Sequence, residues 1–438
     1  MTKGTELWTR AKQIIPGGSQ LLSKRSEMFL PDQWPSYYSK AKGIELWDLD
    51  GTKFIDFCIM GIGANILGYA DKDVNKAVIE RIKNANMATL NCPEEVELAE
   101  KLLKMNQWAG MVRYARTGGE SMSVAVRIAR AYSKKSKVAF SGYHGWHDWY
   151  LATNLLDSTG LNDHLLKGLE PNGVPKTLSG TTIPFHHGKL EELQTIADKH
   201  KDDLGVIVLE VQRSKKPDVS FLQGVRKIAD ETGAVLVFDE ISSGFRNTVG
   251  GVYKEFRVNP DIIVFGKAMS NGFPMGAIVG KKEVMDSAQT SFISSTYWTE
   301  GIGPTAALAT IKKMEEKNAP AHITKIGIKT GKIWEKLGKE HGLKMHVDFD
   351  FPPIMHFGFD YENAQAVRTL FTQEMLKGGY LASGGFYVSY AHKTKDVEAY
   401  ADKVNEVFAL LKSAIEKNEV EKMLNGPIAH SGFQRLTN

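Results

Sequence analysis

The sequence predicts an α/β protein with a large domain, built on a mostly parallel sheet covered by helices, and a smaller α+β lobe. Three observations lead to this prediction. The chain has 438 residues, more than a single hydrophobic core usually holds. Short apolar runs alternate with amphipathic helices through the middle of the chain. The pattern then changes to long helices after about residue 305.

The central apolar runs have the length and composition of buried strands. They cover residues 111–117, 137–143, 204–211, 234–240, 261–267 and 276–280. A helix is expected over 120–133, where Met122, Val126 and Ala129 recur at helical spacing, and another over 221–233. Runs that are apolar on both faces and separated by helices are typical of a parallel sheet covered on each side.

Both ends of the chain contribute to the predicted smaller lobe. Residues 42–58 have the pattern of a hairpin with "DLDG" at the turn, and the segment after residue 305 combines long helices with a few short strands. We therefore assign residues 61–310 to the large domain, and residues 1–60 and 311–438 to the smaller lobe.

Composition excludes several classes of function. The 55 basic and 51 acidic residues are scattered along the chain without long runs of one sign, so no nucleic-acid partner is expected. No apolar window of about 18 residues occurs, and the polar start of the chain is unlike a signal peptide, which predicts a cytoplasmic protein without a membrane partner. Cys58 and Cys92 form no C-x-x-C pair, so neither a disulfide framework nor a metal site is expected.

Ligands of open parallel sheets bind beyond the carboxyl ends of the strands, where four segments here carry polar residues. In the first, "TGGES", Thr117, Gly118 and Gly119 stand between a strand and a helix. Free amides at a helix start attract anions, and glycines let the backbone approach a phosphate closely. The alternative is a plain helix-entry turn.

The second segment, "SGYHGWHDWY", crowds aromatic rings and histidines after the strand at 137–143. Such rings suit stacking on a flat ligand, and a histidine suits proton transfer. The alternative is an aromatic core cluster. Tyr143 and His144 lie nearest the strand end and are therefore the candidates for a site.

The third segment, "VFDE", ends a strand with Asp239 and Glu240. Neighbouring residues of a strand point to opposite faces, so one carboxylate at most faces a given ligand. A buried carboxylate needs a partner, and an ion pair with Arg246 is the structural alternative.

The fourth segment, "IIVFGKAMSNG", places Lys267 directly after an apolar run. A buried, unpaired ammonium tends to lose its proton, and the free amine is a nucleophile for carbonyl compounds. Alternatively, Lys267 extends to solvent or pairs with an acid. Together, the four segments supply a turn for a phosphate, an aromatic ring for stacking, an acid and an amine. Pyridoxal phosphate (PLP) requires all four, because its aldehyde forms a Schiff base with a lysine and an acid keeps its ring nitrogen protonated.

These four motifs, in this order, resemble those of the class III (fold type I) PLP-dependent aminotransferases, and most closely the glutamate-1-semialdehyde 2,1-aminomutase-like members. The resemblance extends from "LWTRAKQIIPGG" to "FYVSYAH". It implies that Lys267 forms a Schiff base with PLP and then moves the substrate proton. By the same resemblance, Asp239 pairs with the pyridine nitrogen of PLP, while Ile241 and Tyr143 pack on the two faces of its ring, with His144 beside Tyr143. Glu210 lies on the substrate side of the cofactor. The phosphate is held by Thr117, Gly118 and Gly119.

The resemblance also implies a homodimer in which a threonine of one subunit reaches the phosphate of the other. The matching segment, "SSTYWTEGIGP", is longer than the usual pattern. The spacing to Pro304 favours Thr299 as the residue that reaches the phosphate, whereas the local sequence "STY" favours Thr296.

Departures from the aminomutase pattern concern the substrate. Met60 replaces a tryptophan, "SGGFYVS" offers glycines in place of a glutamate, and Arg25, a candidate for binding a carboxylate, is displaced by one residue. We therefore expect a transaminase acting between a small-molecule amino donor and an aldehyde or ketone acceptor, with intramolecular amino transfer as the alternative. The surroundings of Trp146 hint at a hydroxylated or sugar-like substrate.

Overall fold

The computed structural model describes residues 2–213, 215–433 and 436. The chain forms two compact units, one of Met1–Asp71 with Asn318–Asn438 and one of Lys72–Lys317. The larger unit begins and ends later in the chain than the large domain proposed from sequence, 61–310, and those domain bounds stay a prediction. Among the described residues, no helix is both long enough and apolar enough to cross a membrane.

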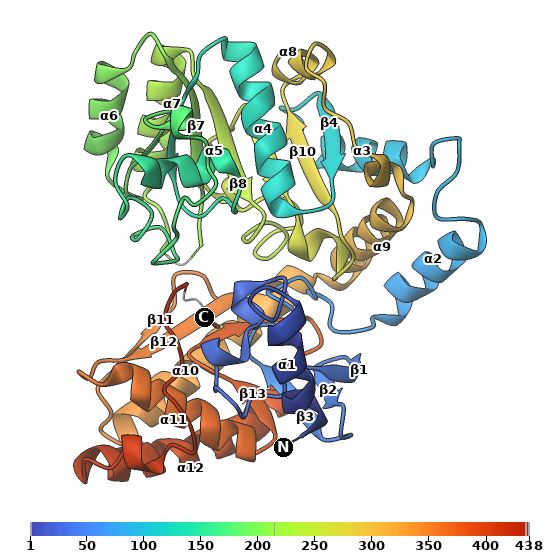
Figure 1. Ribbon diagram of the computed structural model, residues 1–438. Coiled ribbons are helices and arrows are strands. Elements are labelled where there is room, and N and C mark those ends of the chain that lie inside the picture. Colours follow the sequence, from blue (N-terminus) through green and yellow to red (C-terminus); the bar gives the residue numbers. More distant parts are fainter. Residues whose placement is uncertain (1, 214, 434–435, 437–438) are drawn as a thin grey trace. The chain divides into compact units, whose positions relative to one another are not determined.

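The larger unit contains a seven-stranded sheet in the order β4-β10-β9-β8-β7-β5-β6 (Figure 1). Its strands are β4 Met111–Ala115, β5 Lys137–Ser141, β6 Thr182–Pro184, β7 Leu204–Glu210, β8 Val235–Glu240, β9 Ile262–Phe265 and β10 Gly276–Gly280. Only β10 runs against its neighbours, β4 and β9. The prediction of a mostly parallel sheet is therefore confirmed.

Both faces of this sheet are buried. Val208, Val237 and Val264 share one core cluster with the apolar side of α4, whereas Ile207, Phe238 and Ile263 alternate with them and are equally inaccessible to solvent. The helices of this unit are α2 Lys72–Lys83, α3 Glu94–Met105, α4 Gly118–Ser133, α5 Asp148–Leu151, α6 Leu190–Lys199, α7 Val219–Thr232, α8 Lys282–Met285 and α9 Ile302–Lys317. The α7 helix ends at Gly233, whose φ of +67° suits glycine.

The smaller unit combines both ends of the chain. Its four-stranded sheet has the order β1-β2-β3-β13, and a three-stranded sheet has the order β11-β12-β14. The strands are β1 Tyr38–Lys42, β2 Glu45–Asp48, β3 Lys53–Phe57, β11 Met345–Asp348, β12 Ile354–Phe359, β13 Tyr380–Ala382 and β14 Gly385–Tyr387. The hairpin predicted over 42–58 is present as β2 and β3, and β13 pairs with β3 in parallel.

Helices α1 Lys3–Ile14, α10 Ala319–Glu340, α11 Ala364–Lys377 and α12 Thr394–Glu416 complete the smaller unit. In α12, Val397, Tyr400, Val404, Phe408 and Leu411 are buried at intervals of three and four residues. This amphipathic spacing is why the helix forms and packs against α10 and α11.

Candidate active site

One edge of the large sheet brings the predicted site residues together. Because β10 is antiparallel to both of its neighbours, strands β4, β5, β7, β8 and β9 all run in the same direction. The residues at and after their carboxyl ends are therefore gathered at one edge, from Thr117 after β4 to Lys267 after β9.

Lys267 begins a short 3₁₀ helix, Lys267–Ser270, and has a left-handed backbone with φ of +40°. A non-glycine residue in this region costs free energy and is held there by its surroundings. Its half-buried amine donates a hydrogen bond of 2.8 Å to the Ser242 hydroxyl. Burial, aided by the positive charges of Arg213 and Arg246, lowers the pKa of Lys267 to about 7. A large share of this amine is therefore unprotonated, and nucleophilic, at neutral pH.

Asp239 is the next-to-last residue of β8, and only 4% of its surface is exposed. Its carboxylate lies 2.8 Å from His144 Nδ1 and accepts a bond of 3.0 Å from the Ile241 amide. His144 Nε2 donates to the Ser141 carbonyl at 3.2 Å, since a carbonyl oxygen can only accept. The imidazole is thereby fixed in orientation, and it holds the carboxyl group in place.

Glu240 points to the other face of the sheet, as strand alternation predicts. It is fully buried and accepts a 2.8 Å bond from the Tyr253 amide as well as a bond from the Val252 amide. Burial raises the pKa of Glu240 to about 8. This carboxyl group therefore anchors the loop at 250–253, and of these two neighbouring carboxyl groups Asp239 is the one on the Lys267 side.

The start of α4 forms a cradle with little room for a side chain at Gly118 or Gly119. Thr117 caps the helix together with Glu120, and the Ser121 amide donates to the Thr117 carbonyl. The Gly118 and Gly119 amides belong to the first turn, where no earlier helical carbonyl can accept from them. A Cβ on Gly118 would lie 3.2 Å from the Ile241 side chain, and one on Gly119 would lie 2.8 Å from His147. These amides and the positive end of the helix dipole suit a phosphate.

His147 was not predicted as a site residue, although its motif was. Its buried Nε2 has no hydrogen-bond partner among the described residues, and it would lie 3.0 Å from a Cβ on Gly119. A ring nitrogen without a partner among the described residues, beside the first two amides of a helix, is consistent with a ligand at this point. Its place in "GWHD", three residues after His144, was the available signal.

Tyr143 and Glu210 meet at the ends of β5 and β7. The Tyr143 amide donates to Glu210 at 2.9 Å, and the same carboxylate accepts a bond of 2.8 Å from Arg213. The Arg213 guanidinium lies 6.0 Å from the centre of the half-buried Tyr143 ring. Sequence analysis missed Arg213 and Ser242. Ser242 stands just beyond the third segment, three residues after Asp239, and this position was the available signal, whereas only its contacts reveal Arg213.

The remaining predicted residues are exposed or belong to the other unit, and of these Trp146 lies beside the glycine cradle, its Nε1 3.6 Å from where a Cβ on Gly119 would be. Thr296 and Thr299 are exposed and belong to the 3₁₀ helix Thr296–Thr299. Trp146 is 68% exposed and its ring lies 4.4 Å from that of His147. Arg25 and Met60 belong to the smaller unit, where Arg25 lies 5.6 Å from the Phe433 ring and Met60 is buried.

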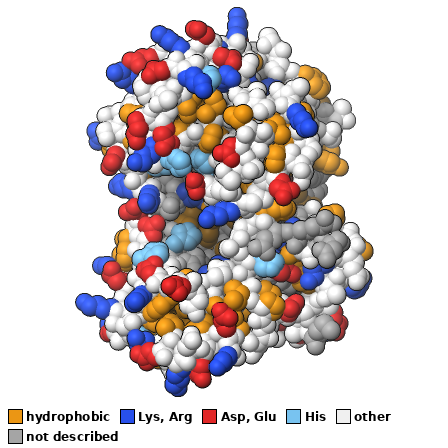
Figure 2. Space-filling view, turned by 60° about the vertical axis from the view of Figure 1, so that its left-hand side comes forward, with side chains coloured by type: hydrophobic (Ala, Val, Ile, Leu, Met, Phe, Trp, Pro, Cys, Tyr) orange, Lys and Arg blue, Asp and Glu red, His pale blue; other side chains and the backbone are white. Residues whose placement is uncertain are grey.

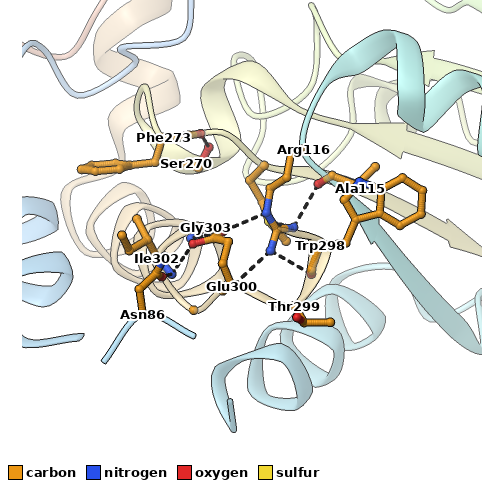
Figure 3. A network of polar contacts seen from close by, with 12 residues as sticks. Asn86, Ala115, Arg116, Ser270, Phe273, Trp298, Thr299, Glu300, Ile302 and Gly303 are labelled. Carbon is orange, nitrogen blue, oxygen red and sulfur yellow. Dashed lines mark hydrogen bonds and ion pairs between the residues drawn. The ribbon is translucent and has the colours of Figure 1, made fainter. Parts of the chain in front are cut away.

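The segment that carries the two threonines is fixed at one end by an ion pair (Figure 3). Arg116 Nε lies 2.7 Å from the Glu300 carboxylate, and Arg116 also donates to the carbonyls of Trp298 and Glu300. Glu300 in turn accepts from the Ile302 and Gly303 amides at the start of α9. The exposed segment is therefore held in one place, next to the strand that precedes the glycine cradle.

This arrangement fits PLP. The glycine cradle would hold the phosphate, Asp239 would face the ring nitrogen, and Ile241 and Tyr143 offer apolar surface for the ring. When bound, PLP supplies an electron-withdrawing ring that stabilises negative charge on the carbon that loses a proton. The fold and this site together define a fold type I PLP-dependent enzyme.

Comparison with known proteins gives the family. Residues 31–344 match the family of class-III aminotransferases, so the chain belongs to that family. The chain is 32% identical to the 3-aminobutyryl-CoA aminotransferase of Cloacimonas acidaminovorans (strain Evry), over 97% of this chain and 99% of that one. It is 30% identical to a glutamate-1-semialdehyde 2,1-aminomutase of Francisella tularensis subsp. holarctica (strain LVS), over 90% and 95%.

Solved structures share the fold. The FumI protein of Sphingopyxis sp. MTA144, in its PLP form, superposes with a TM-score of 0.86 at 22% identity, covering 97% of this chain and 100% of that one. A β-phenylalanine aminotransferase from Variovorax paradoxus gives a TM-score of 0.77 at 21% identity, with 94% of each chain covered. The protein is thus a PLP-dependent aminotransferase-family enzyme with the predicted fold.

Proposed function

We propose that the protein is a transaminase that moves an amino group from an external amino donor to an aldehyde or ketone, with Lys267 as the Schiff-base residue. The observation that carries this proposal is the Lys267 amine, which has a lowered pKa and lies at the same sheet edge as Asp239 and the glycine cradle. Ser242 orients this amine through their 2.8 Å hydrogen bond.

Each side chain then has a distinct task. The free Lys267 amine removes and returns the proton of the amino-bearing carbon. Asp239, held by His144, keeps a proton on the ring nitrogen of the cofactor, and Tyr143 covers the ring and keeps water from it. Glu210 and Arg213 form the boundary of the site on the side of β7.

Intramolecular amino transfer remains the alternative, since curated relatives include both aminotransferases and aminomutases. Met60 and the glycines of "SGGFYVS" depart from the aminomutase motifs and favour transfer to a second molecule. The named substrate of the first relative, an amino acyl-CoA, belongs to that protein, and this chain carries no observation that assigns it.

A homodimer with shared active sites is part of the proposal. Thr296 and Thr299 are exposed, and so are Tyr297 between them, at 71%, and Phe292 just before this segment, at 89%. Exposed aromatic side chains that lie close together in the chain favour a surface that a second subunit covers.

Borohydride reduction followed by peptide mapping tests the role of Lys267. The purified holoenzyme should lose its visible absorbance on reduction and carry the phosphopyridoxyl group on Lys267. Lys267→Arg, which keeps a long basic side chain but no free amine, should bind PLP without this label and lose at least about 10³-fold in turnover. Label on another lysine, or near-normal turnover of the variant, would contradict the assignment.

A single half-reaction separates the two chemistries. With an amino donor alone, a transaminase releases one equivalent of carbonyl product per site and stops. An aminomutase returns isomerised amine without any acceptor and continues to turn over.

A further inference from the structure

The His147 ring lies against the start of α4, beside Gly119. A Cβ on Gly119 would lie 2.8 Å from His147 Cδ2 and 3.0 Å from its Nε2, so the ring occupies the space that a side chain at residue 119 would need. The Cα–Cβ bonds of a helix tilt toward its N-terminus. This edge of the imidazole is therefore on the N-terminal side of Gly119, toward which the amides of the first turn also point.

Neighbouring contacts hold the ring in this position. The centre of the Trp146 ring lies 4.4 Å from that of His147. Gly145 has a φ of +101°, and a Cβ there would lie 3.0 Å from Gly119 Cα. A side chain at residue 145 would thus meet the helix backbone. Its absence lets the 145–147 loop bring His147 to the glycine cradle.

The Nε2 atom of His147 is shielded from solvent, and no described residue forms a hydrogen bond with it. In contrast, both ring nitrogens of the buried His144 and His392 are hydrogen-bonded. A buried polar atom without a partner costs free energy. Burial lowers the pKa of His147, and a neutral imidazole with its hydrogen on Nε2 can still donate to an anion.

Local donors, rather than the charge of the whole protein, must select an anion here. The net charge is only +4 over 438 residues, and Figure 2 shows basic and acidic side chains interspersed on the viewed face. The acidic group at the start of α4, Glu120, accepts the amides of Arg116 and Thr117. The donors at this point of the structure are therefore the first amides of α4 and the His147 ring.

We propose that His147 Nε2 donates a hydrogen bond to the phosphate group of PLP and completes a cradle whose other donors are the Gly118 and Gly119 amides. This inference rests on the placement of PLP in the proposed function. A hydrogen bond to a charged acceptor is stronger than one between neutral groups, and it gives the buried nitrogen its partner. His147 therefore favours PLP over pyridoxal, which lacks the phosphate.

Titrations of the apoenzyme with PLP and with pyridoxal, followed by protein fluorescence, test this role without turnover. His147→Leu should raise the Kd for PLP at least about tenfold and change the Kd for pyridoxal less than about twofold, because only the contact with the phosphate is lost. His147→Gln should stay within about threefold of wild type for PLP, since its amide nitrogen donates from a similar position.

His200→Leu is the matched control for these titrations. His200 is partly buried, as His147 is, and its carbonyl accepts the amide of Leu204, the first residue of β7. It therefore lies at the amino end of β7, at the edge of the sheet opposite the cradle. This variant should bind both PLP and pyridoxal as wild type does.

An exchange of side-chain size tests the position of the ring. Gly119→Ser should weaken PLP binding, because its Cβ would lie 2.8 Å from the imidazole. In Gly119→Ser/His147→Ala the imidazole is gone, and Trp146 Nε1, at 3.6 Å from that Cβ, makes an ordinary contact. The serine hydroxyl then has room to donate to the phosphate. The double variant should bind PLP at least about threefold more tightly than either Gly119→Ser or His147→Ala.

The phosphorus-31 NMR signal of the bound cofactor gives a second readout should His147→Leu fold poorly, as judged by the melting temperature of the apoenzyme. The signal should move between wild type and His147→Gln and stay in place in His200→Leu. A signal that is the same in all three proteins would overturn the inference.

The outcomes separate this inference from the proposed function. Unchanged affinity of a folded His147→Leu for PLP overturns the inference, and so does an equal loss for PLP and pyridoxal, which would assign the ring to the shape of the pocket. In both cases the borohydride label on Lys267 persists and the proposed function stands. A wild-type protein without that label overturns the proposed function, and this inference with it.

Discussion

At the scale of single residues, the chemistry depends on the protonation of one amine. Burial and two guanidinium groups lower the pKa of Lys267 to about 7, although Glu210 and Asp239 act in the opposite direction. Desolvation is the first cause, since a half-buried ammonium loses much of its hydration. The Ser242 hydroxyl then receives the hydrogen bond that orients the amine.

This shift predicts how the apoenzyme takes up PLP. The unprotonated amine attacks the aldehyde, so the uptake rate should rise about tenfold per pH unit below pH 7 and level off above it. An amine with the ordinary lysine pKa of about 10.4 would give a rate that still rises at pH 9. Stopped-flow absorbance from pH 6 to 9 measures this, and a rate that keeps rising through pH 9 would contradict the lowered pKa.

At the scale of elements, the start of α4 determines whether a phosphate can approach. Two consecutive glycines, the Thr117 cap and the His147 ring leave space that a single methyl group would fill. The same close packing holds the 145–147 loop on the helix, because a Cβ on Gly145 would lie 3.0 Å from Gly119 Cα.

Gly119→Ala should therefore weaken PLP binding at least about tenfold, or about 1.4 kcal/mol. Its methyl group would contact His147 at 2.8 Å, within the region where the phosphate is expected. Titration of apoenzyme with PLP measures the change, with melting temperature as a check of the fold. Ser123→Ala on the same helix is the control, because its hydroxyl has no hydrogen-bond partner among the described residues. An unchanged dissociation constant for Gly119→Ala would place the phosphate elsewhere.

At the scale of the whole molecule, the proposed dimer makes each active site depend on two chains. Thr296 and Thr299 are exposed in the subunit, whereas Lys267 and Asp239 are inside it. If such a threonine binds the phosphate in the partner's site, its substitution would impair the partner's site and leave the site of its own subunit unaffected.

Mixing two inactive variants tests this arrangement. Lys267→Ala loses its own site, and a Thr296→Val/Thr299→Val double variant should lose phosphate binding in its partner. Reassembly from an equal mixture should recover about a quarter of wild-type activity, since half of the dimers are hybrids with one complete site each. No recovery, together with a monomer by light scattering, would contradict shared sites. The single threonine variants then identify which residue acts.

Part of the fold and site could be predicted from local pattern. The strand runs, the helix over 120–133 and the opposite directions of Asp239 and Glu240 depend on the period of side chains along one element. The antiparallel β10 was not predicted, because strand direction depends on connections across the sheet. Because β10 is antiparallel to both neighbours, its reversal leaves β4 parallel to β9, and Thr117 and Lys267 lie at the same edge.

The sequence by itself determined the α/β class and the order of the motifs that resemble a PLP site, because these depend on neighbouring residues. Only the tertiary structure decided the partners: His144 for Asp239, Ser242 for Lys267, and Arg213 for Glu210. It alone also brought the His147 ring to Gly119. These contacts join separate strand ends and loops, and strand order, which is a non-local property of the folded chain, sets which of them meet.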